Sequence, residues 1–121
     1  MKVGSSNSLS DISHELFHGY QSETGLTPLG TTASEVEAYL FQDIVAFERG
    51  GGFTLPTSEN KYGARYDEAH NNLLYDGYNQ NDYIRANIYF KYSARNSYGL
   101  YNKVKRSVPG HPAIKKFIPL R

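Results

Sequence analysis

Residues 8–21 read SLSDISHELFHGYQ, and this stretch determines how the chain begins to fold. An apolar stripe with the 3.6-residue period of an amphipathic helix is formed by Leu9, Ile12, Leu16 and Tyr20. Ser8 or Ser10 can cap this helix, and Gly25 can end it. The pattern therefore predicts a helix from about residue 9 to residue 21, with its apolar stripe turned toward a core.

The same stretch contains His14-Glu15-Leu16-Phe17-His18, an HExxH motif. His14 and His18 are one turn apart, opposite the apolar stripe, and this spacing suits two bonds to one zinc ion. Glu15 lies beside the pair, where a general base for a zinc-bound water is needed. Only about 0.007 such motifs are expected by chance in a chain of this composition. The alternative is a pair of solvent-exposed helix histidines that bind no metal.

A second helix is predicted to begin at Thr32-Ala33-Ser34-Glu35, which has the pattern of a capping box, and to end at Gly50-Gly51-Gly52. Its buried side is expected to consist of Val36, Leu40, Ile44 and Phe47. Glu35 and Glu37 point about 200° apart on such a helix, so only one of them can face a metal bound by the histidines. Glu35 could instead serve as the capping-box partner of Thr32.

HELFHGYQ, followed by SEVEAYLFQD at residues 34–43, resembles the zinc metallopeptidases of the zincin class, and most closely the small gluzincins, including toxin-associated ones. The resemblance covers roughly residues 8–48. It implies a zinc ion held by His14, His18 and a Glu that opens a later helix, which corresponds here to Glu35. Three protein ligands and a water are the pattern of a catalytic zinc site.

Two features depart from that family. Tyr39 stands where the family frequently has an Asp that supports a ligand histidine. Gluzincins also have a helix and a sheet before the HExxH helix, whereas only 13 residues precede His14 here. We therefore expect the substrate-binding half to be absent, to be built from later segments, or to be supplied by another part of a larger protein.

A peptidase also needs a donor for the developing oxyanion. The sequence offers candidates of the right type but does not choose among them: Tyr20, His70, His111 and the tyrosines between residues 62 and 101. We expect His70 to be exposed on a helix and His111 to lie in a loop between Gly110 and Pro112.

The rest of the chain is less regular. Residues 53–64 are expected to form a loop, and residues 66–75 a short helix ended by Gly77. Residues 84–92 fit either a strand or a helix, and we favour a helix that Asp82 can cap. The tail from Val108 holds three prolines, so we expect it to be draped over a surface of the molecule rather than to fold alone.

The charges are unevenly distributed. Residues 1–83 contain four Lys/Arg and all 12 Asp/Glu, giving −8, whereas residues 84–121 contain nine Lys/Arg and no acidic residue, giving +9. This basic, tyrosine-containing segment either packs on the acidic part of the chain or forms a surface for single-stranded nucleic acid. We favour packing and do not expect nucleic-acid binding, because the sequence pI of about 7.9 is well below that typical of nucleic-acid-binding domains.

Composition limits the remaining choices. A chain of 121 residues without Cys is expected to form one domain, 1–121, without disulfides or thiolate metal sites. No signal peptide or membrane-spanning segment is visible, so we expect no membrane association and a protein that is cytoplasmic or delivered as part of a larger protein. We predict a mainly α, zincin-like fold with little or no sheet. The predicted function is zinc-dependent hydrolysis of a peptide or protein, with an inactive relative acting as a scaffold or binding module, or a nucleic-acid-binding module, as alternatives.

Overall fold

The computed structural model describes residues 9–50, 61–93 and 108–118. Its helices and 3₁₀ turns are α1 (Leu9–Thr24), α2 (Thr32–Glu48), α3 (Lys61–Asp76), α4 (Gln80–Tyr89), η1 (Phe90–Tyr92) and η4 (Ala113–Lys116). These three ranges contain no β-strand, so the predicted mainly α fold is confirmed. Within them, no helix combines the length and the apolar character that crossing a membrane requires.

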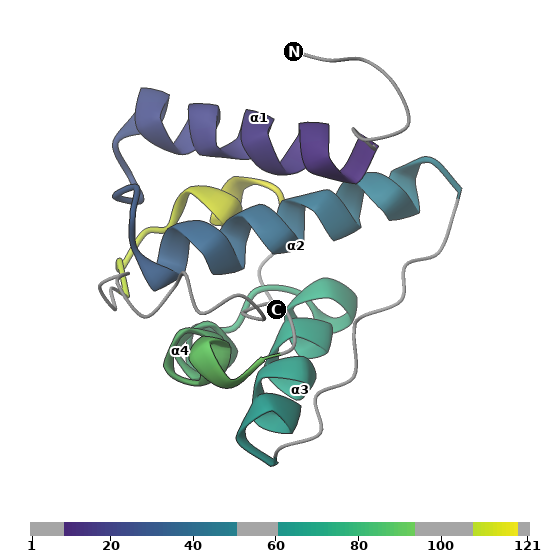
Figure 1. The fold of residues 1–121 in the computed structure, drawn as a ribbon, viewed down its shortest axis with the longest axis vertical. Helices are drawn as coiled ribbons and strands as arrows, with labels where there is room; N and C mark the ends of the chain where they lie inside the picture. Colours follow the sequence, from purple (N-terminus) through teal and green to yellow (C-terminus); the bar gives the residue numbers. More distant parts are fainter. Residues whose placement is uncertain (1–8, 51–60, 94–107, 119–121) are drawn as a thin grey trace.

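The helices are arranged as two pairs. α1 and α2 lie side by side and run in opposite directions, and α3 and α4 form a second pair on the other side of α2 (Figure 1). η4 packs against both α1 and α2. The largest buried apolar side chains come from all of these elements: Phe17, Val36, Leu40, Tyr66, Leu73, Tyr83, Phe90 and Ile114. One core therefore joins the two pairs and the C-terminal turn.

The buried face of α1 differs from the predicted stripe. Leu16 is 65% exposed, whereas Ser13, Phe17 and Gln21 are buried. Phe17 stacks on Phe41 of α2, with the ring centroids 5.0 Å apart. α1 is rotated in this way because its histidine side, as well as Phe17, faces α2.

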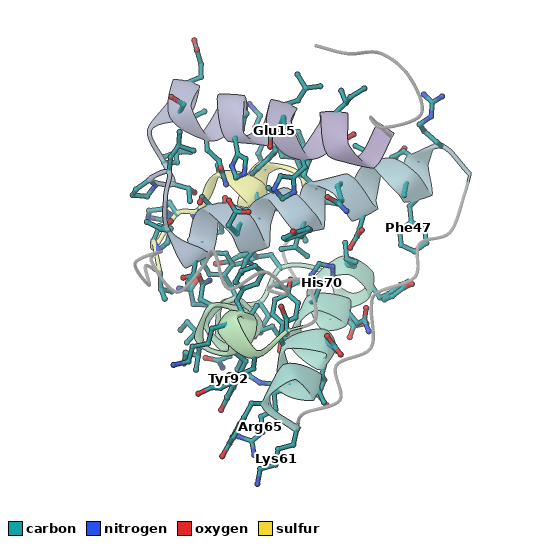
Figure 2. The ribbon with its side chains drawn as sticks, in the orientation of Figure 1. Glu15, Phe47, Lys61, Arg65, His70 and Tyr92 are labelled. Carbon is teal, nitrogen blue, oxygen red and sulfur yellow. The ribbon has the colours of Figure 1, made fainter. Side chains whose placement is uncertain are left out.

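The start of α2 is also one residue earlier than predicted. Thr31 is the N-cap: its hydroxyl accepts a hydrogen bond from the Ser34 N–H (3.2 Å), and the Ser34 hydroxyl receives one from the Thr31 N–H (3.3 Å). The capping box is thus Thr31 with Ser34, and Glu35 takes no part in it. The helix ends at Glu48, just before the predicted glycine stop, and Gly50 has a φ of +77°, which suits glycine. Phe47, expected to be buried, is 42% exposed near the end of the helix (Figure 2).

The second pair of helices follows the sequence pattern with shifted boundaries. α3 begins at Lys61, earlier than predicted, and ends before Gly77, which has a φ of +95°. Residues 84–92 are helical, as favoured, but the cap of α4 is Asn79 and not Asp82. The Asn79 side chain accepts a hydrogen bond from the Asp82 N–H, so Asp82 is in the first turn of the helix. Of the predicted loop at residues 53–64, residues 61–64 belong instead to α3, and residues 53–60 lie outside the described residues.

Glu37 joins the C-terminal turn to the core. Its carboxylate is fully buried and accepts hydrogen bonds from the Thr27 hydroxyl (2.9 Å), the Ile114 N–H (3.1 Å) and the Tyr83 hydroxyl. Burial raises the pKa of Glu37, although these hydrogen bonds oppose the shift by favouring the ionised form. Because Ala113 and Ile114 are buried beside it, the tail belongs to the core rather than to a surface covering.

Among the described residues, one cluster of ion pairs joins the basic segment (residues 84–121) to the acidic part of the chain (residues 1–83). Arg85 of the basic segment pairs with Glu68 and Asp82 of the acidic part. These contacts raise the pKa of Arg85, with the hydrogen bond to Glu68 as the largest cause. Residues 94–107, which carry four of the nine positive charges, lie outside the described residues.

His70 is fully buried, contrary to the expectation that it is exposed (Figure 2). Its Nε2 lies 2.6 Å from Asp43 Oδ2 of α2, and its Nδ1 lies 3.1 Å from the Tyr66 hydroxyl. A helical pattern does not distinguish an exposed histidine from one that a carboxylate on another helix satisfies. This contact ties α3 to α2.

We predict that His70→Leu lowers the free energy of unfolding by about 3 kcal/mol, because it leaves the buried Asp43 carboxylate without its imidazole partner. Urea unfolding followed by circular dichroism measures this. His111→Leu is the matched control, since His111 is exposed in a loop, and it should change stability by less than about 0.5 kcal/mol. Equal effects of the two substitutions would contradict a structural role for the Asp43–His70 contact.

Candidate metal centre

The structure brings the three predicted ligands together between α1 and α2. His14 Nε2 lies 3.3 Å from Glu35 Oε1, and His18 Nε2 lies 3.1 Å from Glu35 Oε2. One ligand atom from each residue lies within 4.8 Å of those of the other two. Each side chain is at most 20% exposed. Glu37 points the other way, as the helical geometry predicted.

The outer nitrogen of each imidazole meets a glutamine. His14 Nδ1 lies 3.2 Å from Gln42 Oε1, and His18 Nδ1 lies 2.8 Å from Gln21 Oε1. The Gln21 amide nitrogen donates to the Ser34 carbonyl, 3.0 Å away, and lies 3.5 Å from Glu37 Oε1. Since both of these partners are acceptors, the Gln21 oxygen must face His18, and His18 Nδ1 must carry a proton.

With these hydrogen bonds, a proton or a metal ion must lie between the Nε2 atom of His18 and the Glu35 carboxylate. With Nδ1 protonated, a neutral His18 presents a lone pair on Nε2 to an oxygen of Glu35. Two lone pairs at 3.1 Å repel each other unless a second proton or a metal ion lies between them. The cluster can therefore exist as an imidazolium–carboxylate pair or as a metal site.

The pKa values of the metal-free cluster describe the first of these forms. Hydrogen bonding to Glu35 raises the pKa of His18 above its usual value of 6.5, although burial opposes this shift. Burial alone would raise the pKa of Glu35, but hydrogen bonds from His14 and His18 outweigh burial and lower it to about 2. A metal ion would replace the protons on Nε2, so metal binding should weaken at acid pH.

A pocket of about 310 Å³ opens beside the cluster and is lined by His14, Glu15, Tyr39 and Gln42. Glu15 is exposed on α1 at this pocket, next to His14 (Figure 2). The Tyr39 ring meets His14 edge to face, with centroids 4.6 Å apart. Glu15 is thus placed beside the ligands rather than among them.

The donor set fits zinc. Two imidazole nitrogens and one carboxylate are the protein ligands of many catalytic zinc sites, where the fourth position stays open. The Nδ1 hydrogen bonds provide the support that ligand histidines usually receive, here from two amides rather than from a carboxylate.

Gln21 and Gln42 were not among the predicted site residues, yet the helical period contains the signal for both. His14, His18 and Gln21 are spaced i, i+4, i+7, and Glu35, Tyr39 and Gln42 repeat this spacing on α2. Each set forms one stripe, and the two stripes face each other.

The structure also narrows the set of oxyanion donors. His70 is fully buried in its contact with Asp43. Tyr20 packs against Phe17 and Phe117, on the flank of α1 opposite Glu15. His111 is exposed in a loop, as predicted. None of these three lines the pocket, whereas Tyr39 does.

Comparison of the chain with protein-family models, with curated proteins and with solved structures finds no match. The resemblance to gluzincins therefore stays a prediction from the two sequence motifs.

We predict that Glu35→Gln makes the metal-free protein less sensitive to acid. The folded-state pKa of Glu35 is about 2 and its ordinary value is 4.5, so the unfolded chain binds this proton more readily. The stability that Glu35 contributes is present above pH 4.5 and is lost as the pH falls toward 2. Urea midpoints of the wild type should therefore fall more steeply over this range than those of Glu35→Gln.

Glu23→Gln, at an exposed position of α1, serves as the control and should keep the wild-type pH dependence. The contribution of His18 has the opposite pH dependence, because its pKa is raised: this stability is present below pH 6.5 and is lost as the pH rises through the folded-state pKa. Parallel acid profiles for the wild type and Glu35→Gln would contradict the ion pair.

Proposed function

We propose that this protein is a zinc-dependent peptidase of the zincin type, with zinc held by His14, His18 and Glu35. The main support for the proposal is the orientation of the His14 and His18 imidazole rings. Each has its Nδ1 on an amide oxygen and its Nε2 on the same carboxylate, beside an open pocket that Glu15 lines. A pair of incidental surface histidines would have no reason to share these features.

Zinc in such a site acts as a Lewis acid toward a peptide carbonyl and a water molecule. Glu15 is the residue at the pocket that can take a proton from the attacking water, because it is exposed there and is not a ligand. The water oxygen bonds to the carbonyl carbon and the C–N bond breaks. The proton held by Glu15 then passes to the leaving nitrogen.

Tyr39 is the residue that best fits the role of oxyanion donor. It lines the same pocket as Glu15, and its ring is fixed against His14 on one side and packs against Phe90, with centroids 6.1 Å apart. A fixed ring costs little reorganisation when its hydroxyl donates to a developing negative charge.

We predict one zinc ion per chain in protein purified without chelators, measured by elemental analysis. Glu15→Gln should keep this zinc and lose nearly all peptide hydrolysis, because the amide cannot accept the proton. Hydrolysis is measured on a broad library of quenched fluorescent peptides. Glu23→Gln is the control for a lost surface carboxylate and should retain both properties.

Different results would separate the alternatives. Protein that neither contains zinc nor binds added zinc would end the zincin interpretation. Zinc-loaded protein that cleaves no peptide would favour the inactive relative that acts as a scaffold or binding module. Retained hydrolysis in Glu15→Gln would show that another group accepts the proton.

A separate prediction concerns Tyr39. Tyr39→Phe should keep zinc and lower kcat about 100-fold, because it removes the hydroxyl that is proposed to donate a hydrogen bond to the oxyanion. Steady-state kinetics on the best peptide measures this, with Tyr20→Phe as the control on the opposite flank of α1. Equal kcat values for Tyr39→Phe and the wild type would exclude the Tyr39 hydroxyl from the reaction.

A further inference from the structure

Gln21 stands at the junction of two hydrogen-bond systems. On one side its amide oxygen faces His18 Nδ1 at 2.8 Å. On the other side its amide nitrogen lies 3.0 Å from the Ser34 carbonyl and 3.5 Å from Glu37 Oε1. The side chain is fully buried, so no solvent competes for these positions. All of its hydrogen-bonding groups are thus committed to fixed partners.

The carboxylate of Glu37 also forms hydrogen bonds that hold the C-terminal turn η4. Glu37 Oε1 accepts the Ile114 N–H at 3.1 Å, and the Thr27 hydroxyl donates to Glu37 while it accepts the Ala113 N–H at 3.0 Å. Thr27 and Glu37 are fully or almost fully buried. A continuous path of contacts therefore runs from η4 through Thr27 and Glu37 to Gln21, and from there to His18.

We propose that Gln21 is a positioning residue of the metal centre: it holds His18 with its proton on Nδ1 and Nε2 toward the ligand position, and η4 sets the orientation of Gln21 through Glu37 and Thr27. This inference rests on the proposed zinc site and adds a route by which the C-terminal segment adjusts zinc affinity. The segment does so without touching the metal.

Gln42 provides an internal comparison. It supports His14 through the same amide chemistry, at 3.2 Å, but it lies at the pocket and has no described contact with Glu37 or Thr27. Both glutamines should matter for zinc affinity. Only Gln21 should transmit a change made at the C-terminal turn.

The test is a pair of double-mutant cycles on zinc affinity, measured by competition with a chromophoric chelator. Thr27→Val keeps the shape of the side chain and removes the hydroxyl that joins Ala113 to Glu37. Gln21→Met and Gln42→Met each remove one amide, and each should weaken zinc binding about 10- to 100-fold. Thr27→Val should weaken it at least about twofold in the wild type and in Gln42→Met, but not in Gln21→Met.

Other results would overturn the inference. Equal effects of Thr27→Val in all three backgrounds would mean that the turn does not act through Gln21. Loss of its effect in both glutamine variants would mean that it acts through general packing of α1 on α2. If Thr27→Val does not fold, Glu37→Gln breaks the same path at its centre and replaces it in both cycles.

A second measurement separates this inference from the proposed function. Nitrogen-15 NMR of the His18 ring in metal-free protein should show a protonated Nδ1 in the wild type and an altered Nδ1 signal in Gln21→Met but not in Gln42→Met. If the wild type binds no zinc, the proposed function fails, and this spectrum still decides whether Gln21 positions His18. An unprotonated Nδ1, or one unaffected by Gln21→Met, would overturn the inference.

Discussion

The antiparallel packing of α1 on α2 is the constraint on which the site depends. It buries a polar stripe from each helix, and buried polar groups are costly unless each finds a partner. Across the interface, His14 pairs with Gln42 and Glu35, and His18 pairs with Glu35. Within α1, the other nitrogen of His18 pairs with Gln21. Phe17 and Phe41 supply the apolar contact that holds the helices at this rotation. The candidate metal centre is therefore part of the packing interface itself.

The two glutamates of α2, Glu35 and Glu37, point in opposite directions and have opposite pKa shifts. Glu35 faces the imidazoles: burial would raise its pKa, but hydrogen bonds from His14 and His18 outweigh burial and lower the pKa to about 2. Glu37, half a turn away, is deeper, and neutral donors alone surround it, so burial raises its pKa. Burial of the Tyr78 ring raises the pKa of Tyr78 to about 12, with the charge of Glu37 as the smaller cause. One carboxylate thus suits a cation, and the other holds three segments of the chain together.

The sequence contained most of the information about which residues meet, and less about how the helices are rotated. HExxH and the position of Glu35 were sufficient to place three side chains together, because helical geometry is local. The apolar pattern predicted that Leu16 is buried, but rotation is decided by the partner helix, and the polar contacts of His14 and His18 outweigh one leucine. The buried state of His70 depends on Asp43, 27 residues away, and no local pattern reports such a contact. The capping box was misplaced by one residue because Thr31 and Thr32 are both good caps.

The rotation of α1 also decides from which side the three candidate ligands can be reached. Around this helix Phe17 and Tyr20 occupy the flank that packs on Phe117, so that flank is closed. Glu15 lies on the other flank, where the pocket opens. In the proposed peptidase, a peptide would approach past Glu15 and Tyr39, the residues proposed as proton acceptor and oxyanion donor. The packing that exposes Leu16 and buries Phe17 is thus the same packing that gives the pocket its chemical groups.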